Sequence, residues 1–166
     1  SGGASSNADC PASFAVENNG SKPVCILTPI TRSVTNDVTV NYELIDEDVE
    51  LVDVDIEWSS NGTDWYDATD AGGTSDGKTG LSADSDGVVH EYIWDSDNAA
   101  PTDLGPGLHS GIYIRIIPND GNWNGPVAET GPFSVGNEAP TVDITDPTDT
   151  QSGNVVINFS LLDSTD

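Results

Sequence analysis

The chain has 166 residues, of which 29 are acidic and 4 basic, so its formal net charge at pH 7 is −25. Binding to phosphate groups needs a basic surface, and this balance argues against nucleic acid and anionic membrane surfaces as partners. No apolar run approaches the roughly 20 residues that span a bilayer, so we expect no membrane insertion in this segment. Methionine is absent and residue 1 is Ser, which indicates a mature or excised piece of a translation product.

The acidic excess indicates an environment in which charge is screened. Self-repulsion at such a net charge destabilises a compact state, and dissolved salt or bound divalent cations reduce that cost. We interpret the composition as that of an extracellular protein in a saline medium, or of a protein that holds Ca²⁺. An acidic, solvated surface without a specific ion is the simpler alternative, and the composition does not decide between them.

Residues 1–22 are predicted to form an N-terminal tail, because Gly, Ser and Asn dominate the stretches SGGASSNAD and ENNGSK. Cys10 in this tail and Cys25 are the two cysteines of the chain. A disulfide between them would close a loop of about 15 residues and contribute on the order of 3 kcal/mol in the chain-entropy model. We expect this bridge in an oxidising compartment, with two separate thiols as the alternative.

After the tail, short strands and turns follow one another. Residues 38–45 and 52–58 alternate apolar and polar side chains, and this period of two predicts half-buried strands. The stretch EWSSNGTDW is predicted to be a hairpin, because Asn61-Gly62 can take positive φ in its turn. Residues 70–87 are expected to be a polar loop that does not pack. The predicted strands are 24–28, 38–45, 52–58, 64–68, 88–94, 112–117 and 130–135.

Seven short strands with almost no helical pattern predict an all-β fold. Their spacing and turn signals are typical of an immunoglobulin-like, seven-stranded β-sandwich, which we place at residues 23–136.

The end of the chain repeats its first strands. Residues 25–46 (CILTPITRSVTNDVTVNYELID) align without a gap to residues 142–163 (VDITDPTDTQSGNVVINFSLLD), at a constant offset of 117. Apolar positions coincide, and chance similarity between strand pairs is the alternative. We therefore expect residues 137–166 to be a linker and the first two strands of a second repeat. Two strands cannot bury a face alone, so either a longer tandem array or strand donation to another subunit would complete them.

The combined pattern resembles the fibronectin type III-like and immunoglobulin-like tandem repeats of large bacterial surface and secreted proteins. The resembling pieces are VTVNYELIDED, VDVDIEWSSNGTDWYDAT, EYIWDS, IYIRIIPNDGNWNGP and PFSVGNEAPTVDI, and they cover nearly all of residues 24–144. The junction GNEAPTVDI resembles linkers between such repeats. The resemblance implies a non-enzymatic spacer, stalk or adhesive module, and it implies no particular ligand.

Calcium is the sharper site hypothesis, because hard cations take several oxygen ligands at once. The candidate ligands lie at a strand end, in the turn before the last strand and at the repeat junction, where loops of neighbouring repeats can meet. They are Asp46, Glu47, Asp48, Asp120, Asn137 and Glu138. Asp84–Asp86 and Asp95–Asp97 are second candidates, and solvated acidic loops are the alternative.

Glycan binding is a further possibility for the aromatic side chains Trp65, Tyr66 and Trp123, since exposed rings can stack on sugar faces. The alternative is that the tryptophans pack over the edges of the sandwich. His90 and His109 stand outside any catalytic motif, and no His/Cys cluster fits zinc, so we expect no enzymatic activity.

The sequence thus predicts a structural and adhesive repeat of an extracellular or cell-surface protein or fibre, with Ca²⁺ as its one candidate cofactor. Its expected partners are neighbouring repeats or subunits, and glycans or other surface proteins. The alternatives are a carbohydrate-binding module of a secreted protein and a filament subunit that assembles by β-strand donation.

Overall fold

The computed structural model describes residues 20–35, 37–48, 51–98, 103–137 and 140–163, and in these ranges the protein is all-β, without helix. No helix that could cross a membrane is found in these ranges. The strands pair antiparallel with their neighbours. They are β1 (Val24–Leu27), β2 (Val38–Ile45), β3 (Leu51–Ser59), β4 (Tyr66–Asp67), β5 (Leu81–Ser82), β6 (Val88–Trp94), β7 (His109–Asn119), β8 (Ala128–Val135), β9 (Thr141–Thr145) and β10 (Asn158–Leu162).

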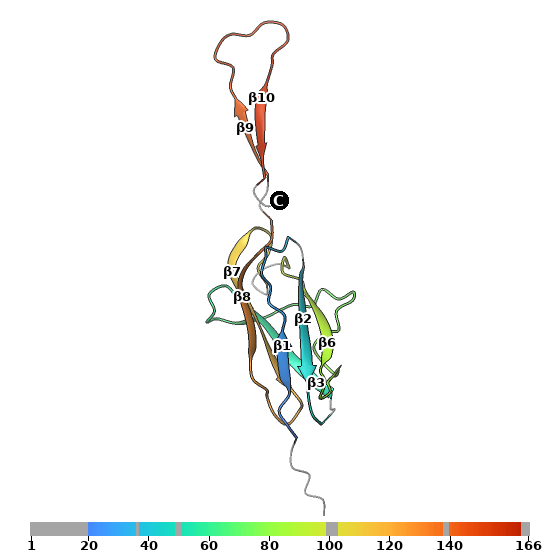
Figure 1. Ribbon diagram of the computed structural model, residues 1–166. Coiled ribbons are helices and arrows are strands. Elements are labelled where there is room, and N and C mark those ends of the chain that lie inside the picture. The colour runs from blue at the N-terminus through green and yellow to red at the C-terminus, as the bar shows by residue number, and fades with distance from the viewer. Residues whose placement is uncertain (1–19, 36, 49–50, 99–102, 138–139, 164–166) are drawn as a thin grey trace, which may run out of the picture.

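Strands β1 to β8 form a two-sheet body, and β9 and β10 form a separate hairpin (Figure 1). One sheet of the body has the order β1-β2-β6, and the other has the order β4-β3-β7-β8, with β5 also paired to β3. Buried side chains from both sheets belong to one core. This arrangement of antiparallel sheets is compatible with a β-sandwich.

The core follows from the period of two along the central strands. In β2, Val38, Val40, Tyr42 and Leu44 are buried while their neighbours are exposed or half-buried. In β3, Val52, Val54, Ile56 and Trp58 are buried, and the exposed Leu51 shares the other face with Asp53, Asp55 and Glu57. Trp58 of β3 stacks on Trp94 of β6, with 5.7 Å between the ring centroids, so these rings join the two sheets directly.

The structure contains a strand at each of the seven positions expected in the body, with two differences. The returning strand of the EWSSNGTDW hairpin is only Tyr66–Asp67, and the strand at 112–117 extends to His109–Asn119. Gly62 takes a φ of 72° in the predicted turn. The Ser59 hydroxyl there accepts hydrogen bonds from the backbone N–H groups of Asn61 and Gly62, at 3.2 and 2.9 Å.

The expectation that residues 70–87 do not pack is wrong. Leu81 of the unpredicted strand β5 is buried, and so is Ala83. Backbone hydrogen bonds tie the segment to both sheets: Asp76 N–H donates to the Glu91 carbonyl of β6, and Val54 N–H of β3 donates to the Lys78 carbonyl, each at 2.8 Å. The segment therefore closes the edge of the body between β6 and β3.

The opposite edge is crossed by the connector between β1 and β2. Pro29 follows β1 and lacks an N–H, so the ladder with β2 ends there. Val34 then pairs in parallel with Val135 of β8, and Gly136 N–H donates to the Val34 carbonyl at 2.8 Å. A groove of about 730 Å³ separates this connector from the start of β2.

The β9–β10 hairpin extends from the end of the body at which β8 finishes (Figure 1). Its register is that of β1–β2 moved by the offset found in the sequence. Cys25 lies opposite Leu44 in β1–β2, and Val142 lies opposite Leu161 in β9–β10, each 117 residues later. The other three residue pairs of β1–β2 recur at the same offset.

Cys10, one half of the predicted disulfide, lies outside the described residues. Cys25 is buried on the core face of β1, and burial raises the pKa of its thiol to about 12.

Candidate functional site: an acidic cluster at the linker end of the body

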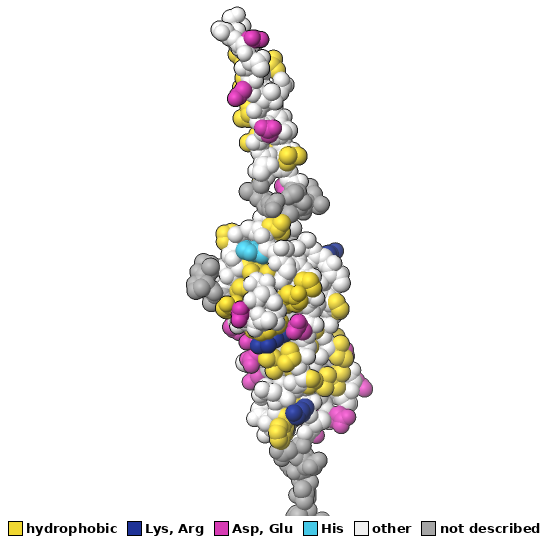
Figure 2. All heavy atoms as spheres, turned by 90° about the vertical axis from the view of Figure 1, so that its left-hand side faces the viewer, with side chains coloured by type: hydrophobic (Ala, Val, Ile, Leu, Met, Phe, Trp, Pro, Cys, Tyr) yellow, Lys and Arg dark blue, Asp and Glu magenta, His cyan; other side chains and the backbone are white. Residues whose placement is uncertain are grey.

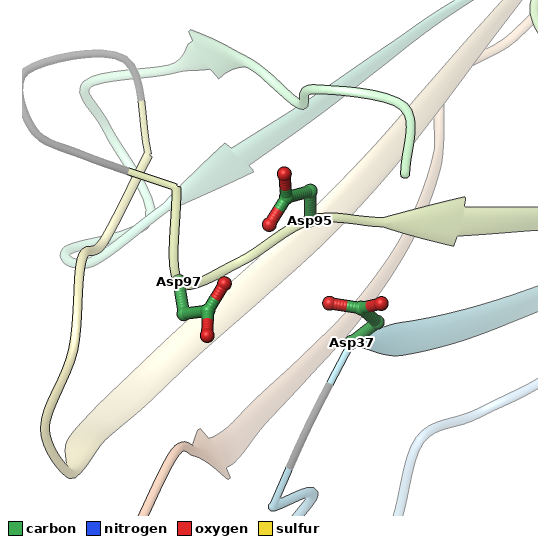
Figure 3. Close-up of side chains that lie close together, drawn as sticks. All are labelled: Asp37, Asp95 and Asp97. Carbon is green, nitrogen blue, oxygen red and sulfur yellow. The ribbon is translucent and has the colours of Figure 1, made fainter. Parts of the chain in front are cut away.

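Three aspartates meet at the end of the body from which the chain continues to the hairpin (Figure 3). Asp37 directly precedes β2, and Asp95 and Asp97 follow β6. Because Val38 lies opposite Trp94 in the β2–β6 register, the start of β2 and the end of β6 are side by side. One carboxylate oxygen from each aspartate lies within 4.8 Å of the other two.

The close approach of three acidic groups is electrostatically unfavourable without a counter-charge. Partial burial, then a hydrogen bond with Asp97 and the negative charges of Asp37, Asp97 and Asp103, raise the pKa of the Asp95 carboxyl group above its ordinary value. A proton or a cation between the carboxylates would relieve this repulsion.

The spacing of the cluster suits a large divalent cation. Oxygen ligands lie 2.3–2.6 Å from Ca²⁺, so ligands on opposite sides of the ion are about 5 Å apart. Three oxygens that lie within 4.8 Å of one another can therefore contact one ion. Since Ca²⁺ takes 6–8 oxygens, the remaining ligands would be water molecules or further protein groups.

A cavity of about 190 Å³ links the cluster to the start of the linker. Its lining includes Asp97 and Asn137, one of the predicted metal ligands, as well as Thr35 and His109. Asn137 is the last described residue before the linker positions 138–139, so the cluster lies where a following repeat would adjoin the body.

Of the other predicted metal ligands, those within the described residues are not near this cluster. Asp46, Glu47 and Asp48 follow the opposite end of β2. The eight residues of this extended strand put them about 25 Å from the cluster. Asp120 follows β7 directly after Asn119. Because Asn119 pairs with Asp53 near the start of β3, Asp120 lies at the same far end of the body. Glu138 lies outside the described residues. Within the body the structure therefore does not bring the predicted set together.

At the far end the acidic groups shape turns. Asp46 is only 2% exposed, and its Oδ1 accepts a hydrogen bond from Asp48 N–H at 2.9 Å. Asp120 Oδ1 accepts hydrogen bonds from the N–H groups of Asn122 and Trp123, both at 2.6 Å. In the second-candidate pair Asp84–Asp86, Asp84 Oδ1 accepts from Asp86 N–H at 2.9 Å. These bonds are typical of Asx turns.

The three aromatic candidates for glycan binding have separate surroundings. The guanidinium group of Arg115 lies 4.3 Å from the centroid of Trp65, and Lys22 Nζ lies 5.6 Å from that of Trp123. Tyr66 packs against the core ring of Trp58, with centroids 5.0 Å apart. A cation already covers one face of each tryptophan, and Trp123 belongs to the turn after β7, so the rings do not form a single platform.

The two histidines also have structural neighbours. His90 Nε2 lies 2.8 Å from the Ser82 carbonyl oxygen and its Nδ1 lies 3.2 Å from Asp76 Oδ2, which fixes the 70–87 segment on β6. His109 Nε2 lies 3.2 Å from the Gly105 carbonyl oxygen. The absence of enzymatic activity stays a prediction.

Sequence reasoning included Asp95–Asp97 as second candidates but missed Asp37. The signal for Asp37 is the pairing of Val38 with Trp94 across 56 residues of sequence, which depends on the strand register. Comparison with protein-family models, with curated proteins and with solved structures found no match for the chain.

Proposed function

We propose that this chain is a structural and adhesive repeat unit of an extracellular surface protein or fibre, and that it contains one repeat and the first two strands of the next. The observation that carries the proposal is the β9–β10 register, which repeats that of β1–β2 at an offset of 117 residues. A sequence alignment alone could arise from similar strand composition. The shared register extends the agreement from the sequence to the pairing of the strands.

The exposure of the hairpin supports the same conclusion. Phe159 and Leu161 are 63% and 67% exposed, whereas their counterparts Tyr42 and Leu44 are 1% and 0% exposed. Hydrophobic side chains run along the hairpin in Figure 2. An isolated two-stranded ribbon is marginal in water, and further strands must cover such a face.

The difference in length between β2 and β10 also fits the two-strand start of a repeat. Residues Val38–Val40 of β2 pair with β6 and precede the part of β2 that faces β1. Among the described residues no strand pairs with their counterparts 155–157, and β10 begins only at Asn158.

The strand groups support an immunoglobulin-like or fibronectin type III-like sandwich with seven principal strands. The proposal is supported by taking β1, β2 and β6 as strands A, B and E, and β3, β7 and β8 as strands C, F and G, although strand D of the constant-type immunoglobulin sheet has no counterpart among the described strands. Strand β4 then extends the C-F-G sheet beside β3.

In this function the module is a spacer that connects successive repeats. The chain enters the body at one end and leaves it at the other, so successive repeats follow one another in a line (Figure 1). The net charge of −25 keeps such an array soluble in a saline extracellular medium. Its partners are neighbouring repeats of the same protein.

Calcium is the proposed regulator of the junction. Asp37, Asp95 and Asp97 lie at the end that adjoins the hairpin, and Asp163 occupies in the hairpin the place that Asp46 has in the body. Calorimetry without and with millimolar Ca²⁺ tests this part: we expect the melting temperature to rise, and an unchanged value would remove the ion from the function.

A fusion in cis tests the repeat. Asp163 corresponds to Asp46, so a second copy of residues 47–135 joined directly after Asp163 supplies β3 to β8 in the correct register. We expect the amides of β10 to become strongly protected from hydrogen exchange, because the hairpin then joins a closed core. The same fusion with Leu161→Asp is the control and should leave them exposed. Equal exchange rates in the 166-residue chain and the fusion would refute the repeat.

A further inference from the structure

We propose that the β9–β10 hairpin binds a second copy of this chain by taking the place of β1–β2 on the partner's β3–β7–β8 sheet. The inference rests on the proposed function in one respect: it treats the hairpin as the β1–β2 of a second repeat. It goes beyond that function in naming a partner in trans.

The hairpin offers the same pattern of apolar side chains as the strands that it would replace. In the body, the inward side chains of β1 and β2 pack on the β3–β7–β8 sheet within one core. Each inward position has an apolar counterpart in the hairpin. The pairs are Cys25 and Val142, Leu27 and Ile144, Val38 and Val155, Val40 and Ile157, Tyr42 and Phe159, and Leu44 and Leu161.

The substitutions between the two strand pairs favour the hairpin as the occupant. Among the described residues the buried Tyr42 hydroxyl has no hydrogen-bond partner, which is unfavourable, and displacement would return it to water. Phe159 fills the same position with a ring of similar size and no hydroxyl.

Backbone pairing with β6 is conserved in the exchange, whereas the hydrogen bond from Ile30 N–H to Thr130 has no equivalent, because Pro147 stands at the matching position of the hairpin. The hairpin carries its own β9–β10 hydrogen bonds, as β1–β2 does. Residues 155–161 would pair with β6 of the partner as Val38–Leu44 of its own β2 do now. The seven residue pairs of the β2–β6 ladder would thus be replaced by seven pairs between the hairpin and β6.

The geometry makes the association directional. Each chain has one hairpin and, once its own β1–β2 is displaced, one acceptor sheet, and these are different surfaces. Contacts of this heterologous kind produce rings or open filaments rather than isologous dimers. In the folded monomer the chain's own β1–β2 occupies the sheet at high effective concentration, so exchange requires that β2 first separates from β6.

A variant that disables its own β2 tests the proposal in the full chain. Leu44→Asp puts a charge at a position that is 0% exposed, and this chain cannot complete its body with its own β1–β2. Its hairpin is intact and its acceptor sheet is open. We expect this variant to be folded in oligomers by native mass spectrometry and circular dichroism, and to unfold as it is diluted, with a midpoint that depends on concentration.

Two matched variants complete the test. Leu44→Asp combined with Leu161→Asp lacks both possible occupants, and we expect it to be unfolded at every concentration. Leu161→Asp alone should be a folded monomer, because its β1–β2 is unchanged. The proposal is overturned if Leu44→Asp is as unfolded as the double variant, or if it is a folded monomer. Protection of β10 in the cis fusion would then show that the repeat stands and only association in trans has failed.

Discussion

Replacement of Tyr42 by Phe tests the account of the core, because it removes one buried atom and keeps the ring. Tyr42 is 1% exposed, its hydroxyl finds no hydrogen-bond partner in the described part of the chain, and burial raises its pKa above the ordinary value of 10.0. A buried hydroxyl without a partner costs about 1–3 kcal/mol, and the small void that the oxygen leaves costs part of that gain. We therefore expect Tyr42→Phe to stabilise the protein by about 1 kcal/mol, which raises the melting temperature of a chain of this size by about 2–4 °C.

Tyr92 is the matched control. It is also fully buried, but its hydroxyl donates a hydrogen bond to the Ala68 carbonyl at 2.6 Å. Tyr92→Phe should destabilise the protein by about 1 kcal/mol, the net value of a typical hydrogen bond. Urea unfolding of both variants at pH 7 measures the contrast. If Tyr42→Phe is destabilised as much as Tyr92→Phe, the Tyr42 hydroxyl has a partner and the reasoning is refuted.

Three further predictions follow from other sites. Asp95→Asn should raise the melting temperature measured in chelator, because it removes one of three like charges that lie within 4.8 Å of one another, and such charges repel by about 1 kcal/mol even in a water-like dielectric. The same variant should abolish any rise of the melting temperature with Ca²⁺. An unchanged melting temperature in chelator would contradict the cluster. In the reduced protein the raised pKa of the Cys25 thiol contributes stability that is fully present below the ordinary pKa of 9.0 and is lost as the pH rises toward about 12. Cys25→Val should therefore make the free energy of unfolding in urea fall less steeply with pH in the alkaline range. Leu81→Ala should cost about 2–5 kcal/mol by the same assay, and a loss below about 0.5 kcal/mol would mean that this segment does not pack.

The body was predictable where one face of a strand is buried and the other is solvated. Residues 38–45 and 52–58 have this pattern, because each inward side chain needs an apolar neighbour from the other sheet. Strand β5 has only two residues, Leu81 and Ser82, which are too few for a period. The 70–87 segment packs through backbone hydrogen bonds to β3 and β6, and such bonds have no signature in side-chain composition.

The candidate site was less predictable, because it depends on register. Asp95 and Asp97 stood out as neighbouring acidic residues in one loop. Asp37 joins them only because β2 and β6 pair with Val38 opposite Trp94. The predicted ligands at Asp46–Asp48 and Asn137 lie at opposite ends of the body, and they could meet only across two successive repeats, which remains a prediction.

The crossing of the β1–β2 connector has a mechanical consequence. Strand β1 starts at one end of the body, and Val135 of β8 leaves at the other, beside Val34 in a parallel bridge. Tension between the two ends would run along β1 and β8, so the hydrogen bonds of their ladders would be sheared together instead of being opened one at a time. We expect force spectroscopy on the chain pulled through residues 20 and 137 to give a higher rupture force than pulling across the strands, so that the module acts as a load-bearing link.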